Sequence, residues 1–244
     1  MGFLRQRFHF TLWPTLFTIP AVLFMLGLGT WQVERLSWKT ALIAARDAAL
    51  AAPAVPLPES SDEALPLDFH HVTAHGAFEH DKELYIGAFD SRDVEGFQIV
   101  TPFRLDDGAV LLVNRGFVPT RRKDPSTREA GQIAGPVDIT GILRHADPPR
   151  GLVVPQNRPG DNFWFYVDIP AMAATRDLDR VLPFYLEAGP AANPGGFPIG
   201  GQTRVSLPND HLQYAITWYL FALTLTVIYF IYHYRKPQGE EPAS

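Results

Sequence analysis

Two long windows without charged residues constrain the fold of this chain more than any other feature. No Asp, Glu, Lys or Arg occurs in residues 8–33 or in residues 211–234. The apolar stretches inside these windows, 13–31 and 212–232, are 19 and 21 residues long. At about 1.5 Å of rise per residue, a helix of either length crosses a bilayer core of about 30 Å. The windows therefore predict two transmembrane helices.

Aromatic residues near the ends of both stretches support this interpretation. Trp13 and Trp31 bracket the first stretch, and Tyr229, Tyr232 and Tyr234 lie at the end of the second. Amphipathic rings of this kind favour the boundary between the bilayer and water. A buried helix of a soluble core is the alternative, but two such windows, one on each side of the remaining chain, favour membrane spans.

The first stretch also resembles a signal peptide in its position. Its apolar run is longer than the usual run of about 7–15 residues, and it continues into WQVERLSWK without a small-x-small cleavage site. We therefore expect an uncleaved anchor. Only MGFLRQRFHFTL precedes it, which lacks the long Arg- and Ser-rich composition of an organellar transit segment, so the sequence favours a bacterial membrane.

The segment between the spans, residues 32–211, is long enough for one folded domain. It carries 17 Lys and Arg against 24 Asp and Glu, so its net charge is −7. Two spans place both termini on the same side of the membrane, but the charges do not decide which side, because four basic residues flank the spans on each side. The expected organisation is an N-terminal segment (1–12), a first span (13–31), one domain (32–211), a second span (212–232) and a C-terminal segment (233–244).

The intervening domain is predicted to be mostly β. It contains short apolar and β-branched runs separated by turn residues. The predicted strands are 69–78, 83–88, 97–105, 109–118 and 136–144. The third and fourth form the clearest hairpin, because Asp106, Asp107 and Gly108 supply a turn in which glycine adopts a positive φ.

A few short helices complete the expected fold class, a membrane α+β chain with two spans flanking one mostly-β domain. One helix is predicted from Ser37 to about Ala49, with Ser37 as its N-cap. A second begins at Pro170, because proline favours the first helical position. Ten prolines in residues 148–208 predict extended loops there. Residues 51–66 are expected to form a linker and residues 237–244 a disordered tail.

Composition excludes several classes of function. The chain has no cysteine, which excludes disulfides, zinc–thiolate sites, thiol redox chemistry and thiolate copper transfer. Its three methionines exclude a Met-rich copper relay, and its net charge of −5 argues against a nucleic-acid partner. Walker loops, nucleophile motifs and dinucleotide fingerprints are absent from the sequence, so an enzyme is not favoured.

Polar residues of the domain provide two weaker candidates for chemistry. Histidines cluster at positions 70, 71, 75 and 80, but His71 and His75 would lie about 13 Å apart along a strand, which is too far for one metal ion. Satisfied or surface histidines are favoured there over a metal site. For the polar loop residues, hydrogen bonding in turns is favoured over acid–base catalysis. This second group comprises Asn114, Arg115, Asn162, Trp164 and Asp168.

His211 is the most informative single residue. It opens the second span, where histidine is uncommon. At 3.6 residues per turn it shares a helix face with Tyr214, Ala215, Trp218 and Ala222, and the two alanines would let a flat ring or a second helix approach closely. Imidazole is a common axial ligand of haem iron. A helix cap or an interfacial anchor is the alternative role.

Five ordered motifs resemble the surfeit-locus family of cytochrome c oxidase assembly factors. They are GTWQVERLSWKTALI (29–43), GAFEHDKELYIG (76–87), GFQIVTPFRLDDGAVLLVNRGFVP (96–119), a spaced series from Pro155 to Met172, and NDHLQYAITWY (209–219). Each motif is weak alone, but their order between two spans is specific, and the resemblance covers residues 17–232. One departure is Phe117, where the family usually has tryptophan.

The resemblance implies a topology and a function. It implies cytoplasmic termini and a central domain outside the cytoplasm, periplasmic for a bacterial inner membrane. It also implies a non-enzymatic role in maturing subunit I of aa3-type haem–copper oxidases, with haem a synthase as a further partner. Bacterial members are similar to haem a-binding proteins, and the family's haem-associated histidine corresponds to His211. Haem a would then be the cofactor, with His211 as axial iron ligand and Tyr214 and Trp218 lining the site.

Two other classes of function remain open from the sequence. A cofactor-free membrane scaffold that stabilises an oxidase assembly intermediate is compatible with the same motifs. A membrane-tethered enzyme is the third class, and polar residues such as Arg115 and Asp168 are its only support.

Overall fold

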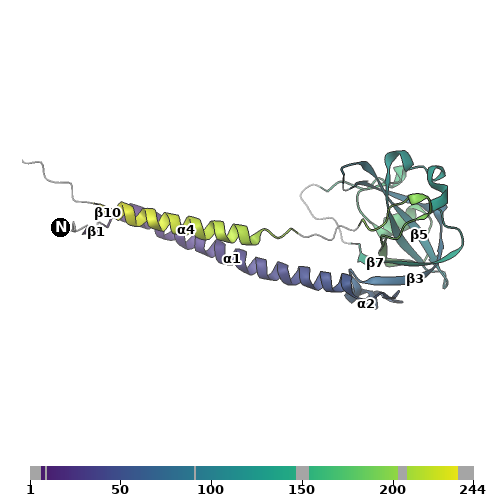
Figure 1. Cartoon of the computed structure of the whole chain (residues 1–244), viewed down its shortest axis with the longest axis horizontal. Helices are drawn as coiled ribbons and strands as arrows, with labels where there is room; N and C mark the ends of the chain where they lie inside the picture. The colour runs from purple at the N-terminus through teal and green to yellow at the C-terminus, as the bar shows by residue number, and fades with distance from the viewer. Residues whose placement is uncertain (1–6, 9, 91, 147–153, 203–207, 236–244) are drawn as a thin grey trace, which may run out of the picture. The chain divides into compact units, whose positions relative to one another are not determined.

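The structure of the chain is a computed structural model that describes residues 7–8, 10–90, 92–146, 154–202 and 208–235. It divides into two compact units, one of residues 1–44 and 206–244 and the other of residues 45–205. The long helices α1 (Leu12–Ala51) and α4 (His211–His233) dominate the first unit, and a β domain forms the second (Figure 1).

The two long helices pack against each other in antiparallel orientation. Hydrogen bonds join them along their shared length, and small residues at the contact, Gly29, Ala215 and Ala222, are buried. The side-chain pairs are Thr11 with His233 (2.8 Å), Thr15 with Tyr229 (2.9 Å), Thr30 with Tyr219 (3.2 Å) and Gln32 with His211 (2.7 Å). Near the chain ends, β1 (Arg7–Phe8) pairs antiparallel with β10 (Tyr234–Arg235).

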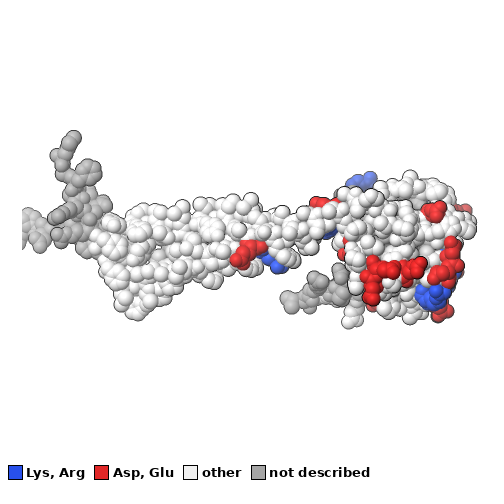
Figure 2. Space-filling view, turned by 90° about the horizontal axis from the view of Figure 1, so that it is seen from below, with Lys and Arg blue, Asp and Glu red and all other residues white. Residues whose placement is uncertain are grey.

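Both helices are long and apolar enough to cross a membrane, as the charge-free windows predict. Only 6% and 11% of the residues in their most apolar stretches are buried, which is unlike the core helix of a soluble protein. Large apolar side chains such as Phe17, Phe24 and Ile231 are therefore exposed on the pair. Figure 2 shows one face of the pair, which is almost free of acidic and basic side chains along most of its length.

The first helix is longer than the sequence predicts. α1 continues without a break to Ala51, so Ser37 lies in its interior and the expected N-cap at Ser37 is wrong. The charged residues that follow Trp31 indicate where the helix surface changes from apolar to polar, but they do not end the helix. Residues 32–51 are rich in alanine, leucine and arginine, which favour the helical backbone.

The β domain is built on a closed five-stranded barrel. The sheet order is β2-β3-β7-β9-β6-β5-β4-β8, and an additional pairing of β3 with β5 closes the ring β3-β7-β9-β6-β5. All neighbours in the ring are antiparallel except β6 and β9, which are parallel. The strands are β2 (Val55–Pro56), β3 (His71–Phe78), β4 (Leu84–Phe89), β5 (Glu95–Leu105), β6 (Val110–Pro119), β7 (Pro136–His145), β8 (Phe163–Trp164) and β9 (Val181–Ala188).

Two apolar cores lie on opposite sides of the barrel wall. Residues that include Phe103, Val113 and Leu186 fill the barrel interior. A second cluster, which includes Leu112 and Trp164, packs the outer side of the wall. The first four residues of β6, Val110 to Val113, alternate between the two clusters, and the strand is buried along its entire length.

All five strands expected from the sequence are present, with ends shifted by one or two residues. The turn between β5 and β6 has Gly108 at φ +85°, as the Asp-Asp-Gly sequence predicts. Helix α3 (Ile169–Thr175) also forms where Pro170 predicts it, and the Asp168 carboxylate caps it by accepting a hydrogen bond from the Ala171 amide at 3.1 Å.

Two expectations for the domain are wrong. The proline-rich region contains β9, an internal strand of the barrel, although loops are expected there. The 51–66 segment is not a free linker, because Val55 pairs with Val72 of β3 and Ser61–Ala64 forms helix α2. The expected disordered tail, 237–244, lies outside the described residues. Short 3-10 helices occur at Leu65–Leu67, His80–Lys82, Thr120–Arg122, Pro125–Gly131, Pro159–Asp161 and Pro194–Gly196.

Candidate functional site

His211 is the first residue of α4, and its ring makes a hydrogen bond to α1. Its Nδ1 lies 2.7 Å from Oε1 of Gln32. An amide oxygen only accepts hydrogen bonds, so Nδ1 is the donor and Nε2 of the neutral ring keeps its lone pair. Among the described residues none forms a hydrogen bond with Nε2. The hydrogen bond through Nδ1 thus orients the histidine ring, while Nε2 can accept a hydrogen bond or bind a metal ion.

The structure argues against the helix-cap alternative for this end of α4. Asp210 occupies the N-cap position, but its side chain makes no capping hydrogen bond. Asn209 donates instead to the Thr40 hydroxyl at 3.3 Å. The ring of His211 is engaged with Gln32. Gln32 could not be recognised as the partner of His211 from the sequence, where its signals are its position at the charged end of the first span and its place in the motif GTWQVERLSWKTALI.

The other two predicted site residues lie on the surface of the helix pair. Tyr214 is 56% exposed. Trp218 is half-buried, and its ring meets that of Phe221 edge-on at 6.2 Å between centroids. Neither forms a hydrogen bond with His211. Ala215 on the same face is buried, so the close approach that small residues permit is used at least partly by a second helix.

Arg115, one of the polar residues of the Asn-Arg-Gly motif, points into the barrel and is only 2% exposed. Its guanidinium donates to the Gly131 carbonyl oxygen and to Asn193 Oδ1 at 3.2 Å, and it lies 4.6 Å from the centre of the Phe78 ring. Burial lowers the pKa of Arg115 to about 10, against the attraction of Glu83. Arg115 is therefore a buried cation at neutral pH.

The remaining polar residues of the motifs perform structural hydrogen bonding, as expected. Asn114 donates to Gln98 at 2.9 Å and accepts from the Gly116 amide at 3.1 Å. Asn162 adopts a left-handed backbone, and its side-chain amide donates to the Glu83 carbonyl oxygen at 2.9 Å. Its Oδ1 accepts a hydrogen bond from the indole of Trp164 at 3.2 Å.

The histidine cluster is dispersed over separate partners. His75 Nδ1 lies 2.9 Å from Asp138, and that hydrogen bond raises the pKa of His75. His80 Nε2 lies 3.0 Å from the Ile133 carbonyl oxygen, and His70 Nδ1 lies 3.3 Å from that of Asp68. Among the described residues no group of three or more His, Asp or Glu side chains could hold a metal ion.

An ion pair that the sequence does not predict lies beside Arg115. Both carboxylate oxygens of Glu83 accept hydrogen bonds from Arg128, and the two side chains are 2% and 1% exposed. Burial alone would raise the pKa of Glu83, but the His80 ring, whose Nδ1 lies 3.8 Å from Oε1, and the hydrogen bonds from Arg128 hold it below its usual value. No local signal reveals this pair, because its members are 45 residues apart.

A polar cleft on the outer side of the barrel wall is centred on Glu187. Its Oε1 accepts from the Tyr185 hydroxyl at 3.2 Å and lies 3.5 Å from Nη1 of Arg144. Its Oε2 is buried and has no hydrogen-bond partner among the described residues. Burial, together with the charge of Glu187, raises the pKa of Tyr185. The cleft has a volume of about 230 Å³ and is also lined by Gln98 and Asn114.

Comparisons with known proteins identify the family. The SURF1 family profile matches residues 19–223. The Surfeit locus protein 1 of Rattus norvegicus is 40% identical over 245 residues, which cover 94% of this chain and 78% of that protein. The human protein of the same name is 40% identical, over 88% of this chain and 75% of its own length. A SURF1-like protein of Monosiga brevicollis is 40% identical, with 90% and 87% covered.

These relatives match this chain across most of their own length, and the family profile covers the barrel and extends into both long helices. The surfeit-locus resemblance is thereby confirmed, although the relatives named here are eukaryotic and do not show a bacterial type. This chain belongs to the SURF1 family, whose members are known as cytochrome c oxidase assembly factors.

Proposed function

We propose that this protein is a membrane-bound assembly factor of an aa3-type cytochrome c oxidase that binds haem a and aids its insertion into subunit I or its stabilisation there. His211 holds the haem iron as an axial ligand, and Tyr214 and Trp218 line the ring. Haem a is the cargo of the protein, and haem a synthase is a candidate donor. SURF1 family assembly factors are generally non-enzymatic, and the proposal requires no catalytic step.

The hydrogen bond between His211 and Gln32 carries this proposal. Metal-binding histidines almost always donate the second ring N–H to a carboxylate or carbonyl oxygen, which fixes the tautomer and the ring orientation. Gln32 Oε1 at 2.7 Å from Nδ1 fits that requirement, and it leaves Nε2 as the iron-binding atom. The residues present therefore fit a haem ligand at this end of the helix pair.

The proposed location is a bacterial inner membrane, with both termini cytoplasmic and the barrel in the periplasm. The apolar helix pair supports membrane insertion. Because the chain has no cysteine, single cysteine variants provide a clean test of topology. A membrane-impermeant maleimide added to spheroplasts should label Asp106→Cys, in the exposed β5–β6 turn, and should not label Ser244→Cys. The reverse pattern would contradict the topology.

Haem binding is tested by purifying the full chain from cells that make haem a. We expect wild-type protein to carry haem a, with a visible spectrum that His211→Ala loses. His75→Ala is the matched control, since it removes a histidine that lies in the β domain and pairs with Asp138. Equal haem content and equal spectra for wild type and His211→Ala would remove His211 from the ligand role.

A cofactor-free scaffold is the second candidate function, and the burial of Ala215 and Ala222 favours it. Part of the predicted haem face then serves only to bind α1, and the protein stabilises an oxidase intermediate by contact alone. The two functions differ in one measurement. If His211→Ala restores oxidase activity to a deletion strain as well as wild type does, the scaffold is correct; if it fails while co-purifying with subunit I, haem handling is correct.

A further inference from the structure

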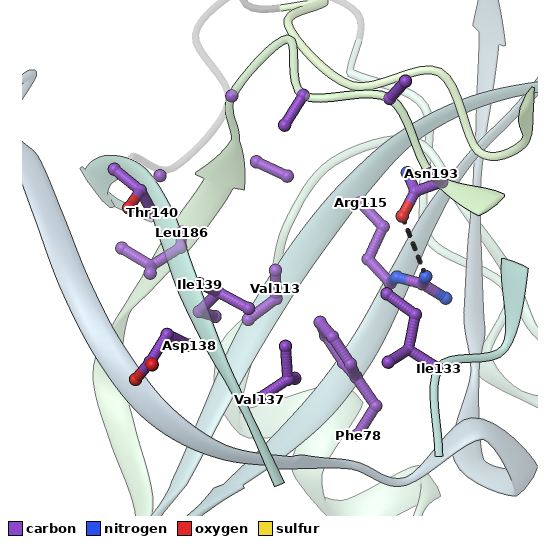
Figure 3. Close-up of a pocket in the computed structure, with 15 residues that line it drawn as sticks. Phe78, Val113, Arg115, Ile133, Val137, Asp138, Ile139, Thr140, Leu186 and Asn193 are labelled. Atoms are coloured by element: carbon purple, nitrogen blue, oxygen red, sulfur yellow. Dashed lines mark hydrogen bonds between the residues drawn. The ribbon is translucent and has the colours of Figure 1, made fainter. Parts of the chain in front are cut away.

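A cavity of about 170 Å³ lies in the mouth of the barrel. Its walls come from four strands of the ring, and a loop around Ile133 together with the segment before Asn193 borders it (Figure 3). Most of the wall is apolar. The apolar side chains that line it are Phe78, Val113, Ile133, Val137, Ile139 and Leu186. Mouths of β-barrels with apolar walls and a few polar groups are common sites for small ligands.

Among the described residues that line the cavity, Arg115 carries the one buried charge. The other charged lining residue, Asp138, is 89% exposed and pairs with His75. Figure 3 shows the Arg115 guanidinium at one side of the cavity, between Ile133 and Asn193. A ligand in this cavity would therefore meet apolar side chains over most of its surface and one guanidinium.

The Arg115 guanidinium has more N–H donors than the described residues around it provide hydrogen-bond acceptors. Arginine carries five N–H groups. Nη2 donates to Gly131 and Asn193, and Nη1 lies 3.4 Å from His80 Nδ1. No described residue accepts a hydrogen bond from Nε of Arg115, and its described partners account for at most three of the five donors. At least two donors are left for a ligand or for water.

The charge of Arg115 is also uncompensated by direct contact. Among the described residues, no carboxylate forms an ion pair with it. The nearby carboxylate of Glu83 is already held by both Nη groups of Arg128, so two buried arginines share one buried glutamate. A buried cation without a paired anion is costly, and an anionic ligand would remove that cost.

We propose that the barrel mouth binds a small carboxylate with an apolar body, whose charged group contacts Arg115 and whose body occupies the cavity. A cavity of about 150 Å³ with apolar walls can hold benzene, so a volume of 170 Å³ suits a body of about six carbons. This site lies entirely within the β domain, and it is independent of the proposed haem ligand.

The probe for this proposal is hexanoate labelled with ¹³C at its carboxyl carbon. It is titrated by NMR against the full-length protein in nanodiscs of zwitterionic lipid, with empty nanodiscs as the blank. We expect saturable binding with one site per chain, and competition by hexan-1-ol that is at least tenfold weaker. Absence of saturation above the blank, or equal competition by the alcohol, would overturn the proposal.

Two variants separate the charge from the cavity. Arg115→Met should weaken hexanoate binding at least tenfold, and Arg121→Met, at an exposed position of the same domain, should leave it unchanged. Ile133→Trp fills the cavity while it retains the charge, so it should also weaken binding at least tenfold. If Arg115→Met fails to fold, Ile133→Trp decides alone. Wild-type affinity in Ile133→Trp would contradict the assignment.

Discussion

Arg128 and Glu83 form a double hydrogen bond between side chains that are only 1% and 2% exposed. The pair links the short helical segment after β6 to the start of β4, two parts of the domain that are distant in sequence. Removal of one partner leaves a buried charge without compensation, which is far more costly than the loss of an exposed ion pair.

The first prediction concerns that cost. Arg128→Met should lower the free energy of unfolding of the β domain by about 3–5 kcal/mol. Arg158→Met is the control, because Arg158 and Asp161 form an ion pair with side chains that are 56% and 68% exposed, and its loss should cost at most about 1 kcal/mol. Denaturant titration of the full chain, followed by Trp fluorescence, measures both. Equal effects would show that burial of the pair is unimportant.

The second prediction is a pH dependence. The hydrogen bonds that Glu83 accepts hold its pKa below the usual value, against the opposing effect of burial. The folded state therefore binds this proton less readily than the unfolded state does. The stabilisation by Glu83 is complete above about pH 4.5 and is lost as the pH falls through the lower folded-state pKa.

Glu83→Gln removes this titration, so its stability should vary less between about pH 6 and about pH 3 than that of wild type. The exposed residue Glu59 provides the control Glu59→Gln, which should retain the wild-type acid slope. Denaturant midpoints across the range test the prediction. An unchanged slope in Glu83→Gln would assign the acid sensitivity to other carboxylates.

The third prediction concerns the helix pair. A Cβ atom at Gly29 would lie 2.7 Å from the ring of Tyr219, whose hydroxyl is held by Thr30. Gly29→Ala should therefore destabilise the pair by about 1–3 kcal/mol through overpacking. A Cβ atom at Gly27, two residues away on the same helix, would have no neighbour within 4 Å, so Gly27→Ala should be neutral or stabilising by about 1 kcal/mol.

SDS titration of the full chain in mild detergent compares these two glycine variants. Because both substitutions raise helix propensity equally, the difference between them isolates the contact with Tyr219. Similar midpoints for the two variants would indicate that the helices separate enough to admit the extra methyl group.

The fourth prediction tests Gln32 as the residue that positions His211. On the proposed haem-binding function, Gln32→Leu should lower haem a affinity by about 10–100-fold and alter the visible spectrum of the remaining bound haem. Gln32→Glu retains an oxygen acceptor and should restore the spectrum. Gln213→Leu, at an exposed position of α4, is the control for general effects on the helix pair. A wild-type spectrum in Gln32→Leu would show that Gln32 does not position His211 for haem and serves only as a contact between the helices.

The fifth prediction concerns the segment that follows β9. The amide and carbonyl of Phe117 pair with those of Ile199, and a Cβ atom at Gly116 would collide with the Ile199 carbonyl oxygen. Gly116 also has φ +111°. Gly116→Ala should destabilise the domain more than Gly135→Ala does, by about 1 kcal/mol or more, because Gly135 has positive φ but open space around it. Equal losses of unfolding free energy in denaturant titrations would show that backbone strain alone, and not the collision with Ile199, destabilises Gly116→Ala.

The sequence was sufficient for elements whose signals are local. The β5–β6 hairpin is an example, because Gly108 and the two preceding aspartates specify the turn. The charge-free windows likewise predict α4 almost to the residue. In α1 the charge-free window indicates only which part of the helix is apolar. The helix itself continues through helix-forming residues to Ala51.

Features that depend on tertiary contacts could not be predicted. Strand β9 contains Pro183 and lies among loops, so its place between β6 and β7 follows only from the apolar contacts of Phe184 and Leu186 in the barrel interior. For the candidate site, the position of His211 at the start of the second span and the family resemblance made it a candidate, but its hydrogen bond to Gln32 joins residues 179 positions apart. The motif that contains Arg115 is visible in the sequence, whereas the burial of its charge is not.

Closure of the barrel limits the ways in which another protein can bind this domain. One edge of β3 pairs with β7, and β2 and β5 share the other edge. Among the described strands, the outermost members of the sheet, β2 and β8, are only two residues long. Beyond the short stretch Gly87–Phe89 of β4, which β8 does not pair, an extended peptide from a partner would find little free backbone to which it could add as a further strand. Recognition of any partner by this domain would then depend on surface side chains, and the same closure keeps neighbouring copies from pairing edge to edge.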